Sequence, residues 1–228
     1  MQLSFRPQAV LFDLDGTLAD TALGLHTATS AALKAIGVEP CTLEQTRTYL
    51  GNGPYMLLAR AIARSQTPGS DILESDALKQ ASQVFNEVYG QECCRGDKVF
   101  PGVKEVLQNL GAHGIKRAVV TNKPHQFVAP VLEKIGLLSL VDYYLGSGVI
   151  ALKKPDPEPL LYVCRHFGVQ ANQAVMVGDS WNDIEAAKSA HMVAVGLTYG
   201  YNRGVDIRTS APDYCFSEFK DVGQLILG

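Results

Sequence analysis

Residues 9–17 read AVLFDLDGT, a run of four apolar residues that ends directly in an acidic motif. Because the apolar run does not alternate with polar residues, it predicts a strand buried on both faces, as in a parallel sheet covered by helices. Side chains alternate along an extended chain, so Asp13 and Asp15 should point in one direction and Leu14 in the other. This stretch therefore indicates an α/β protein with two carboxylates at a strand end.

Four later apolar runs have the same character and end in polar or charged residues. They cover residues 118–120, 143–145, 174–177 and 193–195. Helical patterns alternate with these runs, at residues 103–113, 125–135, 158–167 and 182–190. The repetition of strand and helix predicts a doubly wound, Rossmann-like α/β domain with a parallel sheet.

Residues 20–96 interrupt this alternation because they contain no convincing strand. They show helical patterns instead, at residues 21–36, 43–49, 54–65 and 71–90. Asp20 is predicted to cap the first of these helices and Pro54 to open the third. We therefore expect residues 1–19 and 97–228 to form the α/β core, with residues 20–96 inserted as an all-helical domain.

Composition excludes several classes of protein. The 228 residues carry a formal net charge of −3 without a basic run, which argues against nucleic-acid binding through a charged face. No apolar stretch reaches the roughly 18 residues of a membrane span, and residues 1–7 lack signal-peptide features. Five cysteines without paired metal-ligand spacing predict reduced thiols in a cytoplasmic protein. We expect this protein to be a monomer or a homodimer. The adjacent Cys93 and Cys94 suggest either a redox switch or an ordinary linker.

Polar residues follow most of the predicted strands, and they should converge because ligands of an open α/β sheet bind beyond the carboxyl ends of its strands. They are Asp13 and Asp15, Thr121 and Asn122, Lys154, and Asp179 and Asp183. Four carboxylates against one lysine sum to a charge of about −3, which would repel a phosphate dianion. A hard divalent cation removes this repulsion, and oxygen ligands favour Mg²⁺. The lack of histidine and cysteine at these positions argues against zinc.

The two carboxylates of the first strand can have different roles. If Asp13 binds the cation, it stays anionic and can act as a nucleophile. Asp15 could then offer its backbone carbonyl to the cation and keep its side chain as a general acid and base. Thr121, Asn122 and Lys154 would hold the phosphoryl oxygens. A single aspartate of this kind could equally cap a strand end or a turn, but the combination favours a site.

These residues resemble the four signature motifs of the haloacid dehalogenase superfamily. The motifs stand here as Asp13-Leu14-Asp15-Gly16-Thr17, Thr121, Lys154-Pro155, and Gly178-Asp179-Ser180-x-x-Asp183. The resemblance implies a phosphatase with an aspartyl-phosphate intermediate on Asp13 and a helical cap formed by the insertion. It also implies Mg²⁺ bound by Asp13, Asp15 and Asp179, with Asp183 as a further ligand or as support.

Within the superfamily the sequence most resembles the bacterial phosphoglycolate phosphatases. The segments that carry this likeness are residues 51–53, 120–124, 127–130 and 196–202. The likeness implies hydrolysis of 2-phosphoglycolate, a small phosphorylated substrate, to glycolate and phosphate. Phosphatases of sugar phosphates share several of these segments. Trp181 and His125 depart from the expected pattern, and either line the entrance of the site or pack.

Substrate preference should come from the inserted domain if the core contacts only the phosphate. Gly51, Asn52 and Gly53 form a flexible loop before a predicted helix, whose N-terminus attracts anions. This loop could receive the carboxylate of phosphoglycolate, with Arg60 as a second candidate. An ordinary turn is the alternative interpretation.

Several other functions share parts of this chemistry. A sugar-phosphate phosphatase or a phosphomutase would use the same core, and a dehalogenase would use an aspartate nucleophile without a metal. A phospho-accepting signalling module also combines acidic residues with threonine and lysine around one aspartate. Such a module holds its phosphoryl group, whereas a phosphatase releases many phosphates per molecule.

Overall fold

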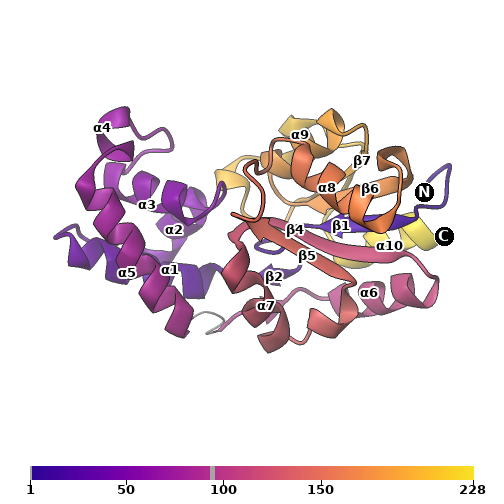
Figure 1. Ribbon diagram of the computed structural model, residues 1–228, viewed down its shortest axis with the longest axis horizontal. Coiled ribbons are helices and arrows are strands. Elements are labelled where there is room, and N and C mark those ends of the chain that lie inside the picture. The colour runs from indigo at the N-terminus through magenta and orange to yellow at the C-terminus, as the bar shows by residue number, and fades with distance from the viewer. Residues whose placement is uncertain (1, 93–95) are drawn as a thin grey trace.

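A six-stranded parallel sheet forms the centre of the α/β core (Figure 1). The computed structural model describes residues 2–92 and 96–228, so Cys93 and Cys94 lie outside the described residues. The strands lie in the order β5-β4-β1-β6-β7-β8, and every pairing in this sheet is parallel. They span Ala9–Phe12 (β1), Lys116–Pro124 (β4), Tyr143–Ser147 (β5), Ala174–Gly178 (β6), Val193–Leu197 (β7) and Tyr214–Phe216 (β8).

Helices cover both faces of this sheet and bury one hydrophobic cluster on each. The first face carries α6 (Val103–Ala112), α7 (His125–Lys134) and α10 (Phe219–Leu227). The second carries α8 (Glu158–Phe167) and α9 (Trp181–Ser189). Short 3₁₀ turns lie at Leu138–Leu140 (η1), Ala171–Gln173 (η2), Asn202–Gly204 (η3) and Ile207–Ser210 (η4).

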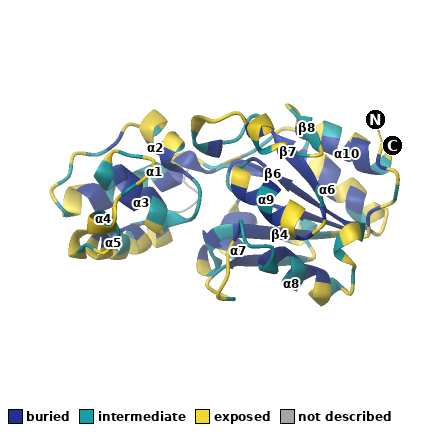
Figure 2. Cartoon of the chain, turned by 90° about the horizontal axis from the view of Figure 1, so that it is seen from above, coloured by how far each residue is buried: buried dark blue, intermediate teal, exposed yellow. Residues whose placement is uncertain are grey.

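The position of strand β1 between two hydrophobic clusters explains why its sequence is apolar throughout. Val10 and Phe12 belong to the cluster on one face, whereas Ala9 and Leu11 belong to the cluster on the other. All four side chains are fully buried, and Figure 2 shows the central strands dark blue between the flanking helices. The predicted doubly wound α/β fold is therefore confirmed.

The position of β1 in the sheet determines where the site forms. The strand pairs with β4 on one side and with β6 on the other, and Phe12 lies level with Val119 and Val177. Strand order reverses at this point, and in open α/β sheets such a point opens a crevice beyond the strand ends. Asp13 is the first residue beyond β1 and so emerges into that crevice.

Within the described residues the helical insertion contains five helices that pack around a hydrophobic cluster, to which Phe127 of α7 also contributes. They are α1 (Ala22–Ala35), α2 (Leu43–Tyr49), α3 (Pro54–Ala63), α4 (Ser70–Leu73) and α5 (Asp76–Glu92). Figure 1 shows them to one side of the sheet. Two short strands, β2 (Ala19–Asp20) and β3 (Lys98–Val99), pair antiparallel where the chain leaves the core and returns to it. Pro54 is the first residue of α3, as predicted.

Several local predictions were wrong. Residues 71–90 form two helices, because Ser75 interrupts the pattern and its Oγ accepts a hydrogen bond from Leu78 N at the start of α5. The N-cap of α1 is Thr21, although Asp20 still accepts from Ala22 N at 3.2 Å. Strands β2, β3 and β8 and helix α10 were not predicted. Among the described residues, no helix has the length and apolar character needed to cross a lipid bilayer.

Candidate active site

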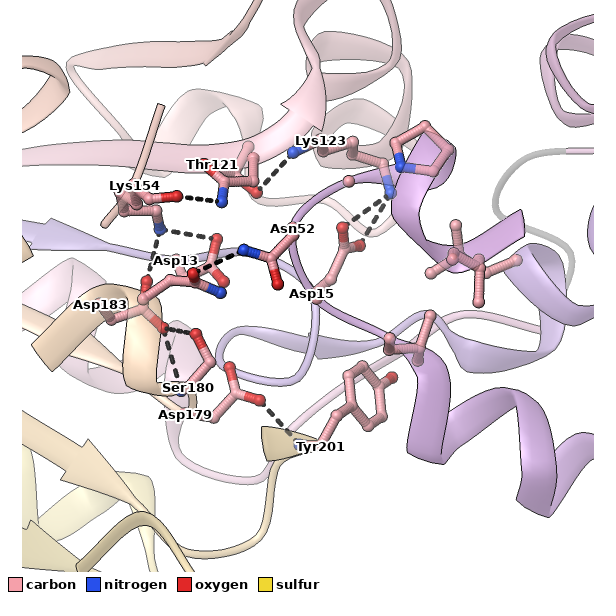
Figure 3. A pocket seen from close by; sticks show the side chains of 18 of the residues that line it. Asp13, Asp15, Asn52, Thr121, Lys123, Lys154, Asp179, Ser180, Asp183 and Tyr201 are labelled. Atoms are coloured by element: carbon pink, nitrogen blue, oxygen red, sulfur yellow. Dashed lines mark hydrogen bonds and ion pairs between the residues drawn. The ribbon is translucent and has the colours of Figure 1, made fainter. Parts of the chain in front are cut away.

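A pocket opens at the carboxyl edge of the sheet and is lined by both the core and the helical insertion (Figure 3). The predicted site residues that line it are Asp13, Asp15, Gly51, Asn52, Gly53, Thr121, Asn122, Lys154, Asp179 and Asp183. Arg60 is not part of this lining. Trp181 is part of it and is 40% exposed, whereas His125 lines a separate pocket.

Three carboxylates from distant parts of the sequence meet at the bottom of this pocket. Asp13, Asp179 and Asp183 each offer one oxygen, and these oxygens all lie within 4.8 Å of one another. Asp13 Oδ1 is buried and accepts no hydrogen bond from the described residues. Such a group of hard oxygen donors fits a small divalent cation such as Mg²⁺.

Lys154 is the counter-charge of this acidic cluster. Its Nζ donates to Asp183 Oδ1 at 2.6 Å and to the Val120 carbonyl oxygen at 2.5 Å, and it lies 3.2 Å from Asp13 Oδ1. Burial alone would lower the pKa of Lys154, but the negative charges of Asp13 and Asp183 outweigh burial and raise it. The lysine therefore stays charged although it is buried.

One lysine does not neutralise three carboxylates. Burial, opposed by the charge of Lys154, raises the pKa of Asp13 to about 6. Burial and the charges of Asp13 and Asp183 raise the pKa of Asp179 to about 8. Without a cation the cluster thus retains protons near neutral pH, and a divalent cation would displace them.

Local hydrogen bonds hold the two later carboxylates in place. Asp179 accepts from Thr17 Oγ1 and from Tyr201 N, each at 2.7 Å. Asp183 accepts from the backbone N and the Oγ of Ser180, at 3.0 and 2.7 Å, and so completes a capping box at the start of α9. A Cβ at position 200 would lie 2.1 Å from the Cβ of Asp179, so the chain needs Gly200 there.

A family model described as haloacid dehalogenase-like hydrolase matches residues 10–197. The chain belongs to this family. The superfamily resemblance predicted from the four motifs is thereby confirmed. Relatives of this hydrolase also support the narrower likeness to bacterial phosphoglycolate phosphatases.

Two curated relatives illustrate this likeness. A phosphoglycolate phosphatase of Haemophilus influenzae is 40% identical over 208 residues, which cover 91% of this chain and 93% of the relative. One of Psychrobacter arcticus is 38% identical over 220 residues, which cover 96% of each. A crystal structure of a predicted phosphoglycolate phosphatase from Haemophilus somnus has a TM-score of 0.87 and 35% identity, over 97% of this chain and 98% of that one.

Lys123 belongs to the site of this hydrolase, but sequence reasoning did not select it. Its Nζ donates to both carboxylate oxygens of Asp15, at 2.8 and 3.1 Å, and it lies 4.9 Å from the ring centre of Tyr89 in the insertion. Thr21 Oγ1 also donates to Asp15, at 2.6 Å. A signal was present, because Lys123 follows Thr121 by two residues and alternation along the strand predicts a shared direction.

Two of the predicted phosphate-binding residues, Thr121 and Asn122, already have hydrogen-bond partners within the protein. Thr121 is buried, and its Oγ1 accepts from Lys123 N at 3.2 Å. The amide of Asn122 donates to the carbonyl oxygen of Lys154 at 2.7 Å. The side-chain amide of Asn122, which was expected to face phosphate, therefore holds the loop that carries Lys154.

The loop of residues 51–53 contacts the core beside the acidic cluster. Asn52 Nδ2 donates to Asn182 Oδ1 at 2.8 Å, and Lys153 Nζ donates to the Asn52 carbonyl oxygen at 3.1 Å. All three loop residues have positive φ, from 65° to 107°, which explains the two glycines. The loop thus reaches the pocket, as expected from the sequence.

Arg60 fixes this loop from behind. Its guanidinium donates to the carbonyl oxygens of Tyr49 and Gly51 at 2.9 and 2.8 Å, and to Asn52 Oδ1 at 3.0 Å. The side chain is buried and its partners are backbone and amide oxygens. This geometry favours a positioning role for Arg60 over the direct substrate contact that was expected.

The cluster predicts a pH-dependent cost of removing its lysine. Lys154→Met should lower the free energy of unfolding by about 3–5 kcal/mol at pH 8 without added metal, because buried carboxylates lose their partner. The loss should be smaller at pH 6. Asp13 and Asp179 have raised pKa values, so protons bound in the folded state relieve the repulsion as the pH falls. Denaturant unfolding at both pH values measures the difference.

Lys104→Met is the matched control, because Lys104 is an exposed lysine of α6 in the α/β domain. It should change the free energy of unfolding little at either pH. A Lys154→Met protein as stable as the wild type at pH 8 would contradict the electrostatic account of the cluster.

Proposed function

We propose that this hydrolase releases phosphate from small phosphate monoesters, with 2-phosphoglycolate as its preferred substrate. One observation carries the proposal. Asp13 Oδ1 is a buried carboxylate oxygen that accepts no hydrogen bond from the described residues and lies beside Lys154 in the pocket. A buried carboxylate oxygen that is oriented by a lysine ammonium and accepts no other hydrogen bond from the described residues is suited to attack phosphorus.

The neighbouring residues match the needs of phosphoryl transfer. Attack by Asp13 would form an aspartyl phosphate and expel the alcohol of the ester. Negative charge on the phosphoryl oxygens would meet the ammonium of Lys154 and the hydroxyl of Thr121. Hydrolysis of the aspartyl phosphate by water would regenerate Asp13 and release phosphate.

The acidic cluster supports a requirement for Mg²⁺. The side chains of Asp13 and Asp179 and the backbone carbonyl of Asp15 would hold the ion, with Asp183 as a further ligand or as support. Three carboxylate oxygens within 4.8 Å of one another fit that role. When bound, Mg²⁺ supplies positive charge that lets a phosphate dianion approach the carboxylates.

Asp15 is the proposed general acid and base. Its carboxylate lies outside the acidic cluster and accepts hydrogen bonds from Lys123 and Thr21. Protonation of the leaving oxygen by Asp15 therefore requires this side chain to exchange those partners for the substrate. The side chain is 20% exposed, which leaves room for such a change.

Two observations support 2-phosphoglycolate among possible esters. The relatives named above are phosphoglycolate phosphatases, and they align with nearly the full chain. The loop of residues 51–53, which includes Asn52, lies against the core at the pocket, where the second end of a short substrate would lie. Sugar phosphates and bisphosphates are larger alternatives.

A panel of small esters tests the proposed substrate. The value of kcat/KM for 2-phosphoglycolate should exceed the values for glucose 6-phosphate and β-glucose 1-phosphate by at least about 10-fold, roughly the net free energy of one hydrogen bond. Many phosphates should be released per enzyme molecule, since a signalling module would stop after one. Isomerised sugar phosphate without release of phosphate would instead identify a phosphomutase.

Asp13→Asn tests the nucleophile. The amide is a poor nucleophile, so kcat should fall by about 10⁴-fold or more, and rapid quenching should detect no phosphoenzyme. The control Asp71→Asn alters an exposed aspartate of α4 and should leave both readouts unchanged. Normal labelling of the Asp13→Asn protein would assign the nucleophile to another residue.

Chelation tests the cation. EDTA should stop turnover, and Mg²⁺ should restore it and raise the melting temperature without substrate. The rise should be larger at pH 8 than at pH 6, because at pH 6 the cation must first displace a proton from Asp179, whose pKa is about 8. Full activity in EDTA would exclude the metal-dependent mechanism.

A further inference from the structure

Three cationic side chains lie near the loop of residues 51–53, and none of them has a carboxylate partner among the described residues. Arg60 is 3% exposed and donates only to backbone and amide oxygens. Lys153 Nζ donates to the carbonyl oxygen of Asn52. Arg203 lines the pocket, and no carboxylate of the described residues lies within ion-pair distance of it.

The other two cations that line the pocket with Arg203 are paired, which makes the lack of a carboxylate partner for Arg203 informative. Lys154 faces Asp13 and Asp183, and Lys123 faces Asp15. Positive charge at the loop is therefore not matched by the acidic residues of the same pocket. Arg60 is buried and Arg203 is half-buried, and charges so placed are normally paired, so their lack of a carboxylate partner among the described residues indicates an anion that the protein binds.

The three cations also lie close enough to affect one another. Burial, together with the charge of Arg203, lowers the pKa of Arg60 to about 10. Burial and the charge of Arg60 lower the pKa of Lys153 as well. An anion placed among these side chains would relieve this repulsion, whereas a neutral group would not.

The backbone of Arg203 is held in an unfavourable conformation. Its φ of 54° and ψ of 31° are left-handed, a region that costs a residue other than glycine about 1–2 kcal/mol. Hydrogen bonds keep it there, because Trp181 N donates to Asn202 Oδ1 at 2.9 Å and Tyr201 N donates to Asp179. The segment that carries Arg203 is thus tied directly to the segment that carries the acidic cluster.

We infer that Arg203 is a specificity-determining residue that binds a second anionic group of the substrate, a carboxylate. A guanidinium can hold a carboxylate through two parallel hydrogen bonds. Lys153 adds positive charge beside the loop of residues 51–53, and Arg60 holds that loop. The inference rests on the proposed phosphatase activity. It assigns substrate preference to the core as well as to the insertion. The sequence had suggested only the insertion.

Two esters that differ only in the second group test this inference. They are 2-phosphoglycolate and its amide, 2-phosphoglycolamide, which has similar size but no carboxylate. Arg203→Gln should lower kcat/KM for 2-phosphoglycolate by about 10- to 100-fold, as expected for a lost charge-assisted hydrogen bond. The value for the amide should change by less than about 3-fold, and Arg203→Lys should recover part of the preference.

Two further variants separate recognition from folding. Arg203→Gly removes the left-handed strain, so its melting temperature should equal or exceed that of the wild type while the preference for the carboxylate is lost. Arg208→Gln is the matched control, because Arg208 is exposed and pairs with Asp206 at 2.9 Å outside the pocket. It should change neither ester.

The outcomes are distinguishable from failure of the proposed function. If the wild type hydrolyses both esters and Arg203→Gln lowers kcat/KM equally for both, or for neither, the role inferred for Arg203 is wrong. The proposed phosphatase activity is then unaffected. If the wild type hydrolyses neither ester, the proposed function falls, and this inference falls with it.

Discussion

Repulsion among buried carboxylates is the constraint on which the rest of the structure depends. Asp13, Asp179 and Asp183 bring oxygens within 4.8 Å of one another, and among the described residues only Lys154 forms ion pairs with them. In water these side chains would move apart. Here Asp13 directly follows a strand buried on both faces, and the other two are fixed near the start of α9. The packed sheet thus holds together charges that would otherwise separate, which favours binding of a cation.

Structural and chemical roles coincide in this site. Asp183 closes the capping box of α9 through Ser180, yet its other oxygen faces Lys154 and the cluster. A strand-end or helix-start aspartate is common for structural reasons alone. In this chain the structural role fixes the orientation of the carboxylate, and that orientation makes it available to a cation. The two interpretations of such an aspartate are therefore compatible.

Sequence allowed the sheet and the core residues to be predicted because each depends on local pattern. An apolar run such as residues 9–12 is buried wherever it lies, and the polar residues after it must then face the crevice. The pairing of Lys123 with Asp15 was not predictable in this way, since it joins two strand ends with a side chain of α5. The role of Arg203 depends on a left-handed backbone that tertiary hydrogen bonds impose.

Lys123 also shows how the insertion can affect chemistry that belongs to the core. Its ammonium is buried between the carboxylate of Asp15 and the ring of Tyr89, so both partners stabilise the buried charge. Tyr89 also contacts Phe127 of α7 edge-on, with ring centres 5.0 Å apart. A shift of α5 would remove the aromatic partner and make the buried ammonium depend on Asp15 alone. The freedom of Asp15 is therefore tied to how closely the helical insertion packs on the core.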